Sequence, residues 1–230
     1  MTAVQAPAPT QTVPLALPYD NADQQREAAV FGMWIFLATE VLFFGGLFVA
    51  YIVYRYEYPA AFKAGSAHLS IMSGAVMTAV LLLGSLLVAI SDVLIRRRVH
   101  DSDPRKAIVR NLAITTFLGV VFLSLEFYEW GQLIHEGFFP GPQFNLARFA
   151  ESGAGGRSPE MFFCLFFFMT GLHAFHMIIG IALVGGVTIA LHRTDNIARH
   201  ANLLENIGLY WHFVDIIWVF LFPLFYLVEA

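Results

Sequence analysis

Seven ionisable side chains of this 230-residue sequence lie inside long apolar stretches, where they could relay protons, bind a metal ion or join helices. They are Glu40, Glu126, Glu129, His173, His176, His212 and Asp215. An ionisable group in an apolar, membrane-like setting is costly and usually faces the interior of a helix bundle. These positions are therefore the first candidates for a functional site.

The two histidines of the segment MTGLHAFHMIIG, His173 and His176, are three residues apart and share one side of a helix. Such a pair could bind a metal ion. Membrane di-iron enzymes need several such pairs, and a bis-histidine haem needs a facing histidine, for which only His212 is available. We therefore predict hydrogen bonding within the bundle. Gly171 and Gly180 flank the pair and allow close helix contact.

Glu40 lies between the apolar runs MWIFLAT and VLFFGG, near the middle of its stretch. Two interpretations stay open. The carboxyl group could relay protons or contact lipid, or it could be a protonated group bonded to a neighbouring helix.

The final apolar stretch carries His212 and Asp215 three residues apart, so a contact between them could satisfy both buried groups. Trp211 and Trp218 lie on the same face as Asp215. For both tryptophans we predict packing between helices or a place in an interfacial belt.

Glu126 and Glu129 lie one helical turn apart in LEFYEWGQ and could act as an acid and base pair. Because they lie near the end of their stretch, we favour hydrogen bonding with Tyr128 and loop groups.

The lone Cys164 excludes an internal disulfide, and we expect it to pack in the bundle. Hydrolase, phosphate-loop and dinucleotide motifs are absent, so no catalytic residue is assigned.

Elements that hold these groups must be membrane spans, because 58% of the residues are hydrophobic and 13% are charged. Soluble domains carry about 25% charged residues. This composition excludes a disordered chain and most soluble enzymes, and the net charge of −4 argues against nucleic-acid binding. The apolar runs do not alternate as barrel strands do. We predict an all-α, polytopic membrane helix bundle with five transmembrane helices, at 31–54, 70–95, 110–134, 161–191 and 207–228.

Two regions are predicted outside the spans. Residues 1–30, rich in proline, are expected to form a flexible cytoplasmic tail before a single five-helix domain at 31–230. The loop at 135–160 contains GFFPGP and ESGAGGRSP, which indicate turns and one short surface helix.

Orientation follows from the Lys and Arg residues of the loops. Nine of them fall on the side of the amino terminus and four on the other side. We therefore place the amino terminus in the cytoplasm and the carboxyl terminus outside. The run Arg96, Arg97 and Arg98 is expected to contact anionic lipid headgroups.

Four ordered segments together resemble subunit III of haem–copper terminal oxidases, the cytochrome c oxidase subunit III family. They are GMWIFLATEVLFFGGLF, EFYEW, TGLHAFHMIIG and YWHFVDIIWVFLF. The likeness extends over about residues 31–228. The mitochondrial form has seven spans, and this chain resembles the shorter, five-helix bacterial form.

The resemblance implies an accessory subunit without redox cofactors or catalytic residues, in the cytoplasmic membrane of a bacterium. Its partners would be subunit I, which carries haem and copper and reduces oxygen while pumping protons, subunit II, which carries copper if cytochrome c is the donor, and phospholipids. The family residues that this chain matches have structural, lipid-related or proton-related roles. They are Glu40, the pair His173 and His176, and the last-helix residues Glu205, His212, Asp215 and Trp218.

Other functions remain as alternatives. The chain could be subunit III of a quinol oxidase, although Glu40 favours a cytochrome c oxidase. A proton-coupled carrier would use Glu40 and Asp215, and a membrane metalloprotein would use His173, His176 and His212.

Overall fold

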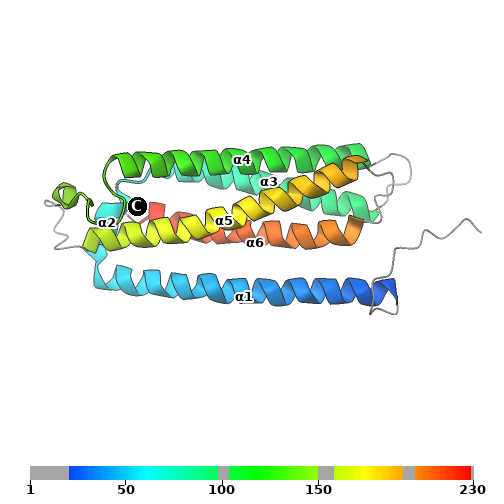
Figure 1. Ribbon diagram of the computed structural model, residues 1–230, viewed down its shortest axis with the longest axis horizontal. Helices are drawn as coiled ribbons and strands as arrows, with labels where there is room; N and C mark the ends of the chain where they lie inside the picture. Colours follow the sequence, from blue (N-terminus) through cyan, green and yellow to red (C-terminus); the bar gives the residue numbers. More distant parts are fainter. Residues whose placement is uncertain (1–20, 98–103, 150–157, 194–199, 229–230) are drawn as a thin grey trace, which may run out of the picture.

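The computed structural model describes residues 21–97, 104–149, 158–193 and 200–228, and the regular elements in these ranges are all helices. Five helices are long and apolar enough to cross a membrane (Figure 1). They are α1 (Ala22–Glu57), α3 (Ile71–Arg97), α4 (Arg105–His135), α5 (Ser158–Arg193) and α6 (Ala201–Tyr226). Two short elements join them, α2 (Pro59–Ser66) and the 3-10 helix η1 (Leu146–Phe149). The predicted all-α bundle with five spans is confirmed.

Helices extend beyond the predicted spans, most of all at the start of α1. Residues 22–30, which we assigned to the tail, are helical, and the Asn21 side chain caps them by accepting a hydrogen bond from the Gln24 N–H at 2.7 Å. Residues 1–20 lie outside the described ranges. Hydropathy locates only the apolar part of a helix, because polar turns at its ends can be held by caps and ion pairs.

Helix α6 lies among the other helices, whereas α1 lies at the edge of the bundle (Figure 1). In the most apolar stretch of α6, 56% of the residues are buried, against 17% in α1. Large apolar side chains such as Phe31, Leu42 and Val49 are accordingly exposed on α1. An apolar outer face is expected where the solvent is lipid. The position of α1 accordingly depends on a few specific contacts.

The carboxyl end of α6 is held by hydroxyl groups from α1 and α2. The last carbonyls of a helix have no partner within it. The Tyr51 hydroxyl donates to the carbonyl of Leu224, and the Ser66 hydroxyl donates to the carbonyl of Phe225 at 2.7 Å. These two bonds attach α1 and α2 to the end of α6.

Helix α2 forms a wedge between α1 and the start of α5. A Cβ atom added to Gly65 would lie 2.3 Å from the Phe162 ring, so only glycine permits this approach. Helix α2 is not among the helices predicted from the sequence. The sequence feature that indicates the start of α2 is Pro59, because proline is favoured at the first position of a helix.

We expect Ser66→Ala to lower the free energy of unfolding by about 0.5–1.5 kcal/mol, because a buried hydrogen bond is lost. Denaturation of the purified chain in bicelles would measure this. The matched control is Ser124→Ala, whose hydroxyl bonds only to the Val120 carbonyl one turn earlier and lies on an exposed face. Equal losses in the two variants would show that the Ser66 bond does not hold α6.

The loop after α4 packs as an aromatic cluster against His68, which precedes α3. The His68 ring lies 4.5 Å from the Phe138 ring centre and 5.3 Å from that of Phe149. Gly137 allows the turn into this loop with a φ of +84°, a conformation that favours glycine. The turns and the short helix predicted here are present within residues 136–149, and residues 150–157 lie outside the described ranges.

Acidification is expected to loosen this aromatic cluster. Burial lowers the pKa of His68 below its usual 6.5, with Glu136 opposing and Arg148 adding to the shift. His68 therefore binds a proton more tightly when the cluster is unfolded than when it is folded. The stability that the cluster gains from neutral His68 is complete above pH 6.5 and is lost as the pH falls through the lower pKa of the folded state. Hydrogen exchange of the loop amides at pH 7.5 and pH 5 would show this. A His68→Phe variant should lose the pH dependence, and an unchanged dependence would contradict the assignment.

Candidate functional site

Glu40 of α1 and His176 of α5 form a contact between the two helices. Oε2 of Glu40 lies 3.2 Å from Nε2 of His176, and Nδ1 of His176 lies 2.8 Å from the carbonyl oxygen of Leu172. A carbonyl only accepts, so Nδ1 carries a hydrogen. Nε2 then either accepts from a protonated Glu40 or, as imidazolium, donates to its carboxylate. In both cases a hydrogen bond joins Nε2 of His176 to Oε2 of Glu40.

Aromatic side chains shield this pair. The Phe44 ring lies 5.3 Å from the His176 ring, and the Tyr210 hydroxyl donates to the His176 carbonyl at 3.1 Å. The side chains of His176 and Glu40 are only 8% and 19% exposed. The bond to a neighbouring helix, one of our two interpretations of Glu40, is therefore present in a largely apolar setting.

His173 has different surroundings. Its ring is buried between Trp218, at 5.2 Å, and Phe122, at 5.6 Å, and neither ring nitrogen has a hydrogen-bond partner among the described residues. The predicted hydrogen bonding is thus confirmed for His176 and wrong for His173. Three residues along a helix leave a rotation of roughly 60° between side chains, enough for the two rings to face different helices.

Both tryptophans of α6 pack inside the bundle, as one of our two interpretations proposed. Trp211 and Trp218 are buried, and the Trp218 indole N–H donates to the Thr78 hydroxyl at 3.1 Å. A Cβ atom on Gly180 would lie 3.4 Å from the Trp211 ring. The predicted close helix contact at Gly180 is therefore confirmed, with Trp211 as the neighbour.

The predicted contact between His212 and Asp215 is wrong. Nδ1 of His212 lies 2.5 Å from the Ser85 hydroxyl of α3, and both oxygens of the buried Asp215 lack a hydrogen-bond partner among the described residues. Sequence spacing showed only that the two groups lie near each other on one helix. Ser85 of α3, and not Asp215, is the hydrogen-bond partner of His212.

The two carboxyl groups of α4 also differ from each other. Glu129 accepts a hydrogen bond from the Tyr226 hydroxyl at 2.6 Å, whereas both buried oxygens of Glu126 lack a partner among the described residues. Tyr128 was predicted as a partner together with loop groups, but its exposed hydroxyl accepts from Gln132 at 2.9 Å. The prediction for Tyr128 was wrong because Tyr128 and Glu129 are adjacent and point about 100° apart.

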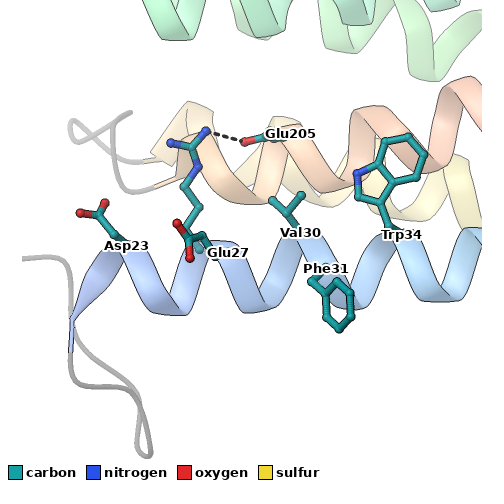
Figure 2. Close-up of a pocket in the computed structure, with 7 residues that line it drawn as sticks. Asp23, Glu27, Val30, Phe31, Trp34 and Glu205 are labelled. Atoms are coloured by element: carbon teal, nitrogen blue, oxygen red, sulfur yellow. Dashed lines mark hydrogen bonds and ion pairs between the residues drawn. The ribbon is translucent and has the colours of Figure 1, made fainter.

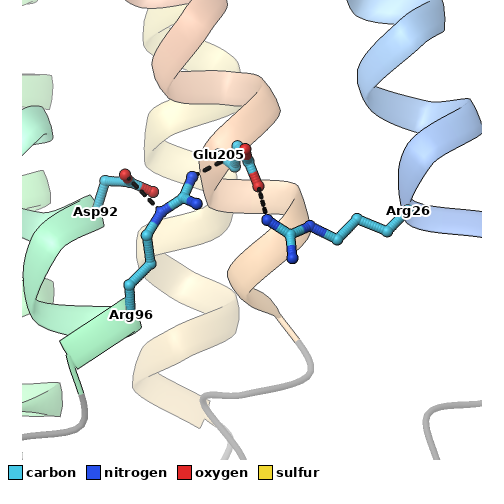
Figure 3. Close-up of polar contacts among 4 residues, drawn as sticks. All are labelled: Arg26, Asp92, Arg96 and Glu205. Carbon is cyan, nitrogen blue, oxygen red and sulfur yellow. Dashed lines mark hydrogen bonds and ion pairs between the residues drawn. The ribbon is translucent and has the colours of Figure 1, made fainter. Parts of the chain in front are cut away.

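Glu205 joins three helices at the other end of the bundle (Figure 3). It lies 3.3 Å from Arg26 of α1 and 2.9 Å from Arg96 of α3, and Arg96 also pairs with Asp92 at 2.8 Å. Partly exposed ion pairs are worth about 0.2–1 kcal/mol each. The guanidinium of Arg96 is already held by Asp92 and Glu205. Contact between Arg96 and lipid stays a prediction. The Arg97 side chain and Arg98 lie outside the described structure.

The described residues contain no group of three or more His, Cys, Asp and Glu side chains that could hold a metal ion. His173, His176 and His212 each contact different side chains. Cys164 is exposed, which corrects our expectation that it packs inside. Among the candidate groups, Glu40, Glu129, Glu205 and His212 each have a partner on another helix.

Fold and site together define a multi-pass helical membrane protein whose buried polar contacts join its spans. Comparison with known proteins gives the family. The family model for cytochrome c oxidase subunit III matches residues 143–229. Cytochrome c oxidase subunit 3 of Thermostichus vulcanus is 30% identical over 218 residues, which are 93% of this chain and 94% of the relative. The chain belongs to the cytochrome c oxidase subunit III family, and the resemblance seen in its motifs is confirmed.

Two further relatives carry different names. A probable quinol oxidase subunit 3 of Staphylococcus aureus is 27% identical over 209 residues, 91% of this chain and 93% of the relative. A haem–copper oxidase subunit I+III of Aeropyrum pernix is 27% identical over 202 residues, which are 85% of this chain but 22% of that longer protein.

Proposed function

We propose that this chain is a non-catalytic accessory subunit of a proton-pumping haem–copper terminal oxidase, where it supports stability, proton uptake and lipid binding. The observation that carries the proposal is the 30% identity to a cytochrome c oxidase subunit 3 along nearly the whole chain. The site agrees with it, because Glu40, Glu129, Glu205 and His212 are engaged in contacts between helices.

Subunit I is the proposed direct partner, and the haem and copper belong to it. The relative from Aeropyrum pernix, named as subunit I+III, supports this pairing. We further propose subunit II and phospholipids as neighbours. The outward apolar face of α1 offers a surface that lipid or another subunit would cover.

The proposed location is the cytoplasmic membrane of a bacterium, with the amino terminus inside. The distribution of nine Lys and Arg residues against four supports this orientation. Arg105 lies at the same end of the bundle as Arg26 and Arg96, and donates to the Leu191 carbonyl at the end of α5 at 2.9 Å.

The electron donor is either cytochrome c or a quinol, because relatives of both names match at similar identity. We propose cytochrome c on the basis of the more identical relative and of Glu40. In that case subunit II of the purified complex should contain copper, and a copper-free subunit II would favour the quinol oxidase.

Gentle purification of a tagged chain from its native membranes tests the proposal. We expect co-purification of a larger subunit with haem bands in the reduced-minus-oxidised spectrum and with bound copper. A preparation that lacks both would refute it. Substrate flux in proteoliposomes that contain this chain alone would instead favour the carrier that uses Glu40 and Asp215.

A further inference from the structure

A groove of about 630 Å³ opens where α1 ends, between α1, α2 and the end of α6. One wall is apolar, with Ile52 of α1 and Leu224 of α6. Arg55, Lys63 and Tyr56 supply cationic and aromatic groups to the same groove. Since α1 ends at Glu57 and α6 at Tyr226, the groove lies at the level where the spans leave the membrane.

The charges of the groove have one sign. None of its lining residues is acidic, and neither Arg55 nor Lys63 forms an ion pair with a described carboxylate. The Tyr51 hydroxyl, which also lines the groove, donates to the Leu224 carbonyl and so fixes α1 against α6 here. With α1 fixed in this way, Arg55 of α1 and Lys63 of α2 line the same groove.

The pocket at the opposite end of α1 provides a contrast within the same chain (Figure 2). It measures about 540 Å³ and also has apolar walls, including Trp34. Its charged groups are Asp23, Glu27 and Glu205 against the single Arg26, which Glu205 already neutralises. An anion would be repelled there and attracted to the groove of Arg55 and Lys63.

We propose that the groove at Arg55 and Lys63 binds one phospholipid with an anionic headgroup. Its phosphate would lie between the two cations, and its acyl chain would follow Ile52 and Leu224 toward the membrane. Basic pockets between membrane helices are suited to such headgroups, and tyrosines are favoured at the interface. This inference deepens the lipid binding in the proposed function by giving it a site, separate from the arginine run at 96–98.

The test uses the whole complex, purified through this chain, stripped of lipid in detergent and titrated with dioctanoyl phosphatidylglycerol or dioctanoyl phosphatidylcholine. Native mass spectrometry counts the bound lipids. The double variant Arg55→Gln with Lys63→Gln should bind one phosphatidylglycerol fewer, or bind it at least tenfold more weakly, with phosphatidylcholine binding unchanged. The charge-conserving variant Arg55→Lys with Lys63→Arg should keep the site.

Controls separate this site from general attraction to cations. Lys106→Gln with Arg110→Gln removes two exposed cations of α4 at the other end of the bundle and should leave the count at this site unchanged. A hundredfold excess of inorganic phosphate should not displace the lipid, because phosphate has no acyl chain. Displacement by phosphate, no preference for phosphatidylglycerol, or an unchanged Gln double variant would each overturn the proposal. If haem and copper are still present, such a result refutes the lipid site alone.

Discussion

Trp218→Ala is expected to lower the free energy of unfolding of the bundle by about 3–5 kcal/mol. Trp218 is fully buried, with its ring 4.7 Å from that of Phe122 and 5.2 Å from that of His173. Its N–H also bonds to Thr78 of α3. Helices in a membrane are held by close packing, so the cavity left at the junction of α3, α4, α5 and α6 removes contacts that lipid cannot replace.

Denaturation in bicelles would measure this loss, with Trp34→Ala as the matched control. Trp34 is 57% exposed on α1, so its truncation should cost little. Trp218→Phe should lower the free energy of unfolding by an amount between those of Trp218→Ala and Trp34→Ala, because the ring contacts are largely kept while the hydrogen bond to Thr78 is lost. Similar losses for Trp218→Ala and Trp34→Ala would show that Trp218 is not the centre of the bundle.

Glu40→Leu is expected to lower the free energy of unfolding by about 1–3 kcal/mol, because the buried Nε2 of His176 loses its partner. The same change should shorten the turnover lifetime of the oxidase, since α1 is attached by few contacts. Glu40→Gln should lower the free energy of unfolding less than Glu40→Leu does. Its amide can donate to a neutral His176 or accept from an imidazolium, so one hydrogen bond survives in either protonation state.

A double-mutant cycle with His176→Phe tests this pair. The loss caused by Glu40→Leu should shrink once His176 is phenylalanine, and strictly additive losses would show that the two side chains do not interact. For function, oxygen consumption should be followed through many turnovers. Glu40→Gln is expected to change the rate of proton uptake or the lifetime, and complete loss of oxygen reduction in a normally assembled complex would contradict an accessory role.

The hydrophobic pattern was sufficient to predict the spans, because a stretch such as residues 64–91 satisfies the length and composition of a membrane helix by itself. Helix ends were less predictable. The polar first turns of α1 are helical because Asn21 caps them and Glu205 pairs with Arg26. The second of these contacts joins residues 179 positions apart, and no local pattern contains it.

The candidate residues were also found from the sequence, because a charge within an apolar run is conspicuous, but their partners were not. Glu40 and His176 are 136 positions apart, His212 and Ser85 are 127, and Glu129 and Tyr226 are 97. Ser85 carries no distinguishing pattern of its own. Periodicity along one helix led us to pair His212 with Asp215, whereas the packing of α3 against α6 supplied the serine.

The sequence by itself determined that this chain forms five apolar helices, which of its polar groups lie inside them, and which family its motifs resemble. The tertiary structure alone decided how these groups pair, where the wedge of α2 holds the end of α6, and where two cations meet an apolar wall. The physical reason is that transfer into a membrane depends on each segment separately. A hydrogen bond or a groove depends on atoms that distant segments bring together.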